Sequence, residues 1–251
     1  MSRYARMRFA GTGSLLAMLL GMSLGAPTLA AQEWSQPWAR ERIAQSPRHS
    51  EWVTIKHDGR NVDTLVVYPE SKDKRPVVLV IHEIFGLSDW AQELADEVAA
   101  AGYIAVAPDL LSGMAPNGGR TKDFASGVTE AVSKLNPDQV TADLNAAADY
   151  GKKIPAANGK LFVAGFCWGG GKSFAFATTR HDLSAAFVFY GTPPPDVTAI
   201  TAPVYGFYAG NDMRVDATIP TLCRSDIRRH SCPFAHQSAP VSFGVDSRIW
   251  N

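Results

Sequence analysis

The chain has 251 residues, of which 46% are hydrophobic and 19% are charged. This length and composition fit one large α/β domain with a single core. The 24 basic residues balance the 24 acidic ones, whereas binding to nucleic acid calls for an excess of positive charge on one face. The balance therefore excludes nucleic acid as an expected partner.

The first 31 residues have the pattern of a secretory signal peptide. Arg3, Arg6 and Arg8 precede an apolar stretch over residues 14–25, and small residues suited to cleavage follow. The stretch is short for a membrane span, which favours a cleaved signal over an anchor. We therefore expect a periplasmic or secreted protein with no membrane attachment after cleavage. In such an oxidising compartment, paired cysteines form disulfides.

From residue 51 onward, the pattern predicts alternating strands and helices. The continuous apolar run at 76–81 is typical of a strand buried on both faces of a parallel sheet. Asn136 can cap a helix that Pro137 begins, and Gln139 can reach back to the cap. The other predicted elements are a hairpin (51–57 and 63–68), helices (88–101 and 170–179), strands (103–107, 161–164, 185–190 and 204–208) and a long loop (112–122). The fold class is therefore α/β, with a doubly wound, mostly parallel sheet, helices on both faces, and one domain over residues 32–220.

Two incomplete motifs argue against cofactor chemistry. The end of a phosphate-binding loop occurs at residues 171–173, but Phe166 stands where that loop needs a glycine. His82 and Glu83 resemble the start of a zinc-binding H-E-x-x-H helix, but Gly86 stands where the second histidine would be. We therefore expect no metal and no cofactor.

The segment G-F-C-W-G at residues 165–169 has the layout of a nucleophile elbow, with cysteine in the place of serine. It lies between a predicted strand and a predicted helix, where a sharp turn exposes the central side chain and needs small neighbours. The N-terminus of the following helix favours a thiolate and a developing oxyanion. Cys167 is therefore a candidate nucleophile. A buried cysteine that serves only as a small hydrophobic residue is the plainer alternative.

Two carboxylates follow other predicted strands. Glu83 comes directly after the buried strand at 76–81, and Asp212 follows the strand at 204–208. Sites in open α/β sheets lie at the carboxyl ends of the strands, so both should reach the same edge as Cys167. Taken singly, Asp212 also fits a turn aspartate and Glu83 a solvated loop carboxylate.

From about Trp52 to Pro220, the chain resembles the dienelactone hydrolases, a family with the α/β-hydrolase fold. The resemblance is carried by H-E-I-F-G (82–86), A-P-D-L (107–110), G-F-C-W-G-G (165–170), Y-G (190–191) and A-G-N-D-M-R-V (209–215). It implies that Cys167 is the nucleophile, Asp212 the orienting acid and Glu83 a carboxylate that controls the thiol. It also implies an oxyanion hole formed by the backbone N–H groups of Ile84 and Trp168.

The C-terminal segment departs from that family. Its members carry a catalytic histidine in a G-H-x-F context, which residues 221–251 lack. These residues contain no Glu and no Lys, and they hold two of the three cysteines, Cys223 and Cys232, which could pair or be accidental. We hypothesise a shifted reading frame or a substituted tail. His236 is the remaining candidate for the catalytic histidine.

Two functions stay open on this reading. The first is hydrolysis of a small lactone or carboxylic ester through a cysteine nucleophile and an acyl-enzyme. The second is a hydrolase-fold binding protein with little or no turnover, because the histidine motif is missing. In either case Trp168 and Phe85 would form aromatic walls, the loop at 112–122 would shape the pocket, and Arg120 could meet an anionic substrate.

Overall fold

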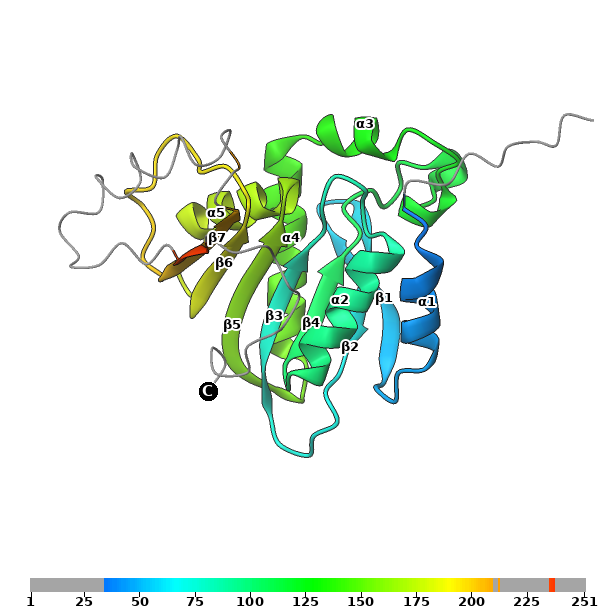
Figure 1. Ribbon diagram of the computed structural model, residues 1–251, viewed down its shortest axis with the longest axis horizontal. Helices are drawn as coiled ribbons and strands as arrows, with labels where there is room; N and C mark the ends of the chain where they lie inside the picture. The colour runs from blue at the N-terminus through cyan, green and yellow to red at the C-terminus, as the bar shows by residue number, and fades with distance from the viewer. Residues whose placement is uncertain (1–33, 210–211, 213–234, 238–251) are drawn as a thin grey trace, which may run out of the picture. The chain divides into compact units, whose positions relative to one another are not determined.

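One eight-stranded sheet organises the part of the chain that the computed structural model describes, residues 34–209, 212 and 235–237 (Figure 1). Its strand order is β1-β2-β4-β3-β5-β6-β7-β8. The first two pairings, β1 with β2 and β2 with β4, are antiparallel, and all the others are parallel. The strands are β1 (Ser50–His57), β2 (Arg60–Val67), β3 (Arg75–Ile81), β4 (Ile104–Pro108), β5 (Ala157–Phe166), β6 (Ala185–Phe189), β7 (Val204–Ala209) and β8 (Ala235–Gln237). The predicted fold class is confirmed.

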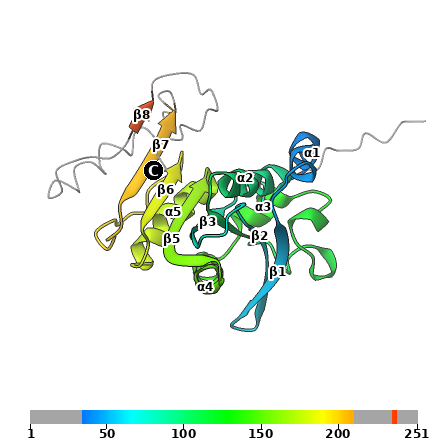
Figure 2. The same cartoon turned by 90° about the horizontal axis from the view of Figure 1, so that it is seen from below.

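Helices cover both faces of this sheet. Helices α4 and α5 pack on β5, and α2 packs on β4 and β2; Figure 2 shows α2 and α4 on opposite sides of the central strands. The helices are α1 (Pro37–Ala44), α2 (Asp89–Ala100), α3 (Val128–Ser133), α4 (Pro137–Lys153) and α5 (Trp168–Thr179), with two 3-10 turns, η1 (Pro116–Gly118) and η2 (Thr121–Asp123). None of the described helices is long and apolar enough to span a bilayer.

Strand β3 shows why its sequence is apolar at consecutive positions. Val77, Leu79 and Ile81 join the core cluster that contains side chains of α4 and α5. Val78 and Val80 point the other way and pack with the alanines of α2. Because successive side chains of a strand point to opposite faces, a strand covered on both sides must be apolar throughout.

The helix caps follow the sequence prediction with one difference. The side chain of Asn136 accepts hydrogen bonds from the N–H groups of Asp138 and Gln139, so it caps α4 as expected. Gln139 does not reach back to the cap. Its amide nitrogen donates instead to Asp143, 2.8 Å away, which already binds His57 and Arg60 from the β1–β2 hairpin.

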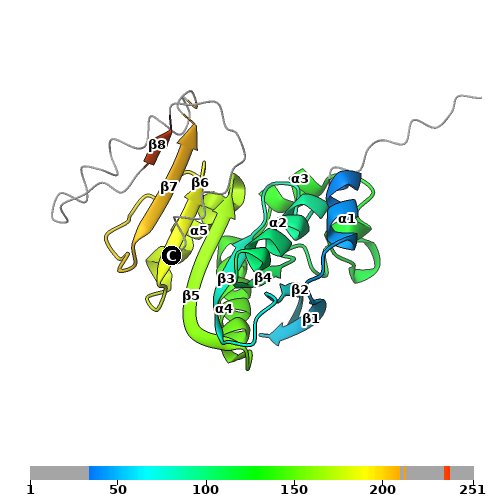
Figure 3. The ribbon, with the colours of Figure 1, turned by 60° about the horizontal axis from the view of Figure 1, so that its bottom comes forward.

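Helix α1 was not predicted, because its sequence offers almost no apolar face. Ala39 is its one buried residue, and ion pairs hold the helix to α2 instead. Arg40 pairs with Asp89 and Arg42 with Glu93. Figure 3 shows α1 beside α2. Polar helices of this kind depend on tertiary contacts rather than on their own periodicity.

The last described strands extend the parallel sheet. Phe166, Phe189 and Phe207 stack across β5, β6 and β7, with ring centroids 4.4 Å and 4.6 Å apart. In β8, His236 is paired in register with Tyr208 of β7. A short strand therefore forms within the segment for which no strand was predicted. The expected signal peptide (1–31), Cys223, Cys232 and the rest of the atypical tail lie outside the described residues.

Candidate active site

Cys167 lies at the apex of the turn between β5 and α5. Its backbone has φ 53° and ψ −116°, outside the conformations that residues with a Cβ normally adopt. Two hydrogen bonds hold the backbone of Cys167 in the turn. Its N–H donates to the carbonyl of Phe189 at 3.0 Å, and its carbonyl accepts from the N–H of Gly171. The cysteine is free and partly exposed. This is the geometry of a nucleophile elbow.

Two glycines allow this turn to form. A methyl carbon added at Gly165 would lie 2.0 Å from the carbonyl oxygen of Gly169, because strand and helix almost touch there. A methyl carbon added at Gly169 would lie 2.3 Å from the carbonyl oxygen of His82. The small residues that the sequence places around Cys167 are therefore required by backbone contacts.

Glu83 reaches the same level of the sheet on the neighbouring strand. Strands β3 and β5 are paired with Ile81 opposite Gly165, so Glu83 and Cys167 each lie two residues beyond one matched pair. Neighbouring strands are about 4.8 Å apart. Glu83 begins a tight turn closed by its bridge to Gly86, and burial raises the pKa of its carboxyl group.

The two N–H groups expected to form an oxyanion hole come from adjoining segments. Trp168 is the first residue of α5, where N–H groups have no acceptor within the helix. Ile84 lies in the turn that follows β3, and both side chains pack against the same small cluster of Leu111, Val128 and Val132. The contact between Gly169 and the His82 carbonyl brings these segments together.

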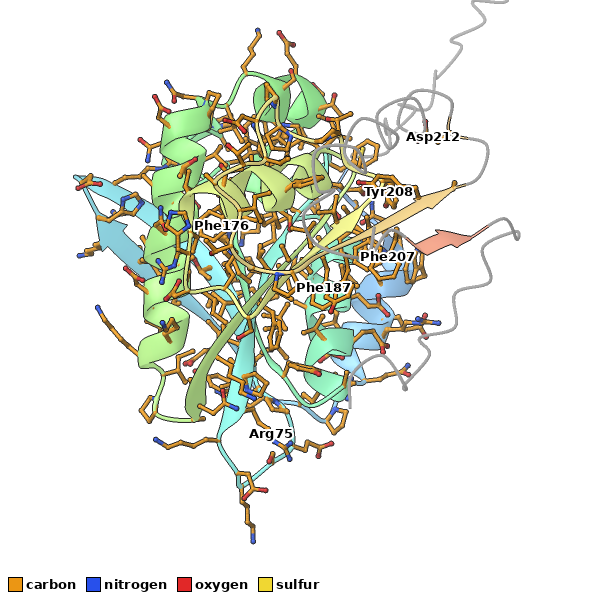
Figure 4. All side chains as sticks on the ribbon, turned by 90° about the vertical axis from the view of Figure 1, so that its left-hand side faces the viewer. Arg75, Phe176, Phe187, Phe207, Tyr208 and Asp212 are labelled. Atoms are coloured by element: carbon orange, nitrogen blue, oxygen red, sulfur yellow. The ribbon has the colours of Figure 1, made fainter. Side chains whose placement is uncertain are left out.

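Asp212 also lies at this edge. It follows β7, and its N–H donates to the carbonyl of Ala209 at 3.1 Å. Figure 4 shows Asp212 at the opposite end of the sheet from Arg75, the first residue of β3. The three strands that precede Glu83, Cys167 and Asp212 thus end at one edge, as the sequence predicts. His236 lies on β8, next to β7.

His82 is a neighbour of the site, whereas its sequence context suggests only an incomplete zinc motif. It is buried and stacks on Trp168, with ring centroids 5.6 Å apart. Its Nδ1 lies 2.8 Å from the carbonyl oxygen of Glu83, which can only accept, so Nδ1 carries the proton. Burial lowers the pKa of His82 to about 4. A ring that is neutral at pH 7 and faces away from solvent supports Trp168 rather than carrying protons.

Tyr190 is a second neighbour whose role the sequence did not suggest beyond the Y-G motif. It follows β6 and has φ 44°, so it is one of four described residues other than glycine in the left-handed region. Burial, together with the negative charges of Glu83 and Cys167, raises the pKa of its phenol to about 12. The phenol therefore stays protonated and can donate a hydrogen bond at the site. A non-glycine residue in strained backbone is often found at a functional site.

In the loop of residues 112–122, Arg120 contacts an aromatic ring, whereas the sequence suggested that it could meet an anionic substrate. The guanidinium of Arg120 lies 3.3 Å from the ring centroid of Trp52 on β1, so its described contact is an aromatic ring. Part of the loop lines an open polar cavity of about 540 Å³ together with the β1–β2 hairpin. Neither that cavity nor a neighbouring one of about 420 Å³ is lined by Cys167 or Glu83. Within the described ranges, no group of three or more His, Cys, Asp or Glu is placed to hold a metal.

This sheet, with a cysteine at a strained strand-to-helix turn, defines a member of the α/β-hydrolase fold class. The model of the "Dienelactone hydrolase family" matches residues 62–237, so the chain belongs to that family. A relative from Yersinia pestis, named "Putative carboxymethylenebutenolidase", is 32% identical over 220 residues, 80% of each chain. A relative of the same name from Escherichia coli K12 is 31% identical over 216 residues, 78% of each chain.

A solved structure supports the fold. The "Putative Dienelactone Hydrolase" from Klebsiella pneumoniae superposes with a TM-score of 0.64 at 23% identity, covering 80% of this chain and 94% of that one. The family establishes that the protein is a hydrolase of the dienelactone hydrolase type, with a small-molecule substrate.

Proposed function

We propose that the protein cleaves a lactone or carboxylic ester through Cys167 and a covalent acyl-enzyme. The observation that carries the proposal is the left-handed backbone of Cys167 at the start of α5. Such strain persists only where the surrounding structure imposes it, and here it leaves the thiol partly exposed at the helix N-terminus. A cysteine that served only as core filler would need neither the strain nor the exposure.

The reaction would proceed in two steps. The sulfur of Cys167 attacks the substrate carbonyl carbon, and the N–H groups of Ile84 and Trp168 bind the resulting oxyanion. The carbon–oxygen bond to the leaving group then breaks, and the released alkoxide takes up a proton. Water attacks the thioester and restores the thiol, giving a carboxylic acid and an alcohol. From a lactone, both groups remain on one molecule.

The thiol proton needs a carrier. Glu83 is half-buried at the same level of the sheet as Cys167. Burial raises the pKa of its carboxyl group, which suits proton exchange near neutral pH. For the second step we propose His236, oriented by Asp212, because β8 joins the sheet next to the strand that precedes Asp212.

A chromogenic ester assay on the purified protein tests the nucleophile. Cys167→Ala should lower kcat by on the order of 10³-fold or more, as removal of other nucleophiles does. Cys223→Ser and Cys232→Ser remove the other two thiols and should leave turnover intact. In a protein that carries both of these substitutions, rapid release of one equivalent of the coloured alcohol before steady state would report the acyl-enzyme.

The same assay separates the second function. If iodoacetamide alkylates Cys167 while the protein turns over no ester or lactone, that result would indicate a binding protein with a hydrolase fold. Turnover that survives Cys167→Ala would instead show that another residue is the nucleophile.

A second pair of variants tests the histidine. His236→Ala should lower kcat by about 10²- to 10⁴-fold if His236 is the general base. His230→Ala is the matched control in the same segment and should have no effect. Equal activity of both variants would remove His236 from the mechanism.

The relatives' name, carboxymethylenebutenolidase, supports a lactone as the substrate class. We also propose a periplasmic or secreted location, on the pattern of residues 1–31. Fractionation of cells producing the full chain, with detection of a form that begins near residue 32, checks this location.

A further inference from the structure

A buried carboxylate lies behind the turn that carries Glu83 and Ile84. Asp109 follows β4 and is 1% exposed. Its Oδ1 accepts hydrogen bonds from the hydroxyl of Thr121 at 2.7 Å and from the N–H of Leu111 at 3.1 Å, and its Oδ2 accepts from the N–H of Thr121 at 3.0 Å. All three donors are therefore held by one side chain.

Thr121 connects Asp109 to the turn after β3. It is fully buried, and its hydroxyl oxygen accepts a hydrogen bond from the N–H of Leu87 at 3.1 Å. A hydroxyl has one proton, which goes to Asp109, so its lone pairs face Leu87. Gly86 lies against the same side chain: a methyl carbon added there would be 2.5 Å from the Thr121 hydroxyl oxygen.

The other described hydrogen bonds of the turn join residues that are close in sequence. The N–H of Gly86 donates to the carbonyl of Glu83 at 3.2 Å, and the N–H of Ser88 donates to the carbonyl of Gly86 at 2.8 Å. Both bonds are internal to the turn and its link to α2. The side-chain amide of Gln92 in α2 donates to the carbonyl of Leu87 at 3.1 Å, and the side chain of Ile84 packs against Leu111, Val128 and Val132. Thr121 connects the turn to the loop after β4, because it bonds Leu87 although the two residues are 34 positions apart in sequence.

We infer that Asp109, acting through Thr121, is a positioning residue that fixes the turn of residues 83–87 and thereby the place of Glu83 and the N–H of Ile84. The hydroxyl of Thr121 is the link, and the carboxylate of Asp109 sets its orientation. This assigns a role to the second half of the long loop, which touches the turn although Arg120 faces Trp52. The inference rests on the proposed function only for its turnover readout.

Thr121→Val tests the link, because valine keeps the shape of threonine and lacks the hydroxyl. Amide hydrogen exchange of the peptide covering residues 82–88 should be about tenfold faster, since the N–H of Leu87 loses its acceptor. kcat on an ester should fall about 10- to 100-fold with KM within about twofold, because a displacement near 1 Å at a reacting centre has that effect. Thr121→Ser keeps the hydroxyl and should restore both values.

Thr64→Val is the matched control. Thr64 is also fully buried, and its hydroxyl donates to the carbonyl of Val62 within β2. This variant should lose stability in thermal unfolding without changing kcat or exchange at 82–88. Asp109→Asn should act like Thr121→Val, because either orientation of the amide places its NH₂ group opposite the N–H of Leu111 or of Thr121.

The outcomes separate cleanly. If Thr121→Val matches Thr64→Val in both kcat and exchange, the inference is overturned. Should Thr121→Val fail to fold, Thr121→Ala and Asp109→Asn give the same two readouts. If the unaltered protein has no turnover, the proposed function fails, and exchange at residues 82–88 still decides whether Thr121 holds the turn.

Discussion

Two neighbouring turns form the candidate site, and they are held in different ways. The turn after β5 contains Cys167 and is fixed by backbone contacts, with Gly165 and Gly169 pressed against carbonyl groups. The turn after β3 contains Glu83 and is fixed by the hydroxyl of Thr121. The first turn therefore depends on the absence of side chains at Gly165 and Gly169, and the second depends on the presence of the Thr121 side chain. Substitutions should therefore affect them with different severity.

The largest expected effect is on the turn after β5. Gly169→Ala places a methyl group 2.3 Å from the carbonyl oxygen of His82, a backbone atom that cannot swing aside. We expect a loss of more than about 3 kcal/mol in the free energy of unfolding, the upper range for overpacking. Urea denaturation measures this loss.

Gly171→Ala is the control for that prediction. The nearest atom to an added methyl carbon is the carbonyl oxygen of Thr192 at 3.3 Å. Alanine also favours a helix interior by up to about 1 kcal/mol over glycine, so the net change should stay within about 1 kcal/mol. Equal losses for the two variants would refute the idea that backbone contacts fix this turn.

A smaller effect is expected from a buried carboxylate that belongs to neither turn. Asp143 of α4 is 1% exposed and accepts from His57, Arg60 and Gln139. Asp143→Asn should reduce the free energy of unfolding by about 2–3 kcal/mol, because Arg60 loses the negative charge with which it pairs. kcat should stay within about twofold of the unaltered protein. A large loss of turnover in the folded variant would show that Asp143 acts on the site itself and not only on stability.

The pH dependence of stability sharpens the role of Asp109. Burial raises the pKa of Asp109 to about 6, against hydrogen bonds from Thr121 and Leu111 that lower it. The folded protein then holds the proton at pH values where the unfolded chain has lost it. Asp109 should therefore reduce stability as pH rises from about 4 to about 6, by on the order of 2 kcal/mol.

Comparison with Asp109→Asn isolates this contribution. The difference in unfolding free energy between the two proteins should change across that pH interval and be constant above about pH 7. A difference that is constant from pH 4 to 7 would mean that the carboxyl group does not titrate there.

The smallest effect concerns the ring of Trp168. The ammonium of Lys172 lies 5.1 Å from the ring centroid on α5, and burial lowers the pKa of this lysine. A cation–π contact of this kind is worth about 0.5–1 kcal/mol. Lys172→Met should change kcat by less than about threefold, because His82 still packs on the ring. A larger change in an ester assay would give Lys172 a direct part in the reaction.

The elements that dominate the fold were predictable because their sequences carry their own signal. The apolar run of β3 reflects burial on both faces, and Asn136 with Pro137 specifies the start of α4. The glycines around Cys167 predict a turn that has no room for a side chain at their positions. The ends of the parallel strands place Glu83 and Asp212 at one edge of the sheet.

Other features depend on contacts between distant segments. Helix α1 has little apolar periodicity and is held by ion pairs to α2. Thr121 lies in a polar loop, and only the folded chain shows that it meets Leu87 and Asp109. One signal was available for Asp109: an acidic residue directly after a fully buried strand must find donors or lose its charge. Tyr190 stands in the Y-G motif, but the motif does not reveal that its φ is 44°.

The hydrogen bond from Cys167 to Phe189 ties the apex to a strand that comes later in the chain. During synthesis, the segment up to α5 emerges before that acceptor exists. The hydrogen bond that holds the apex can therefore form only after β6 has docked. The apex geometry on which the proposed reaction of Cys167 depends is therefore complete only when the neighbouring strand is in place.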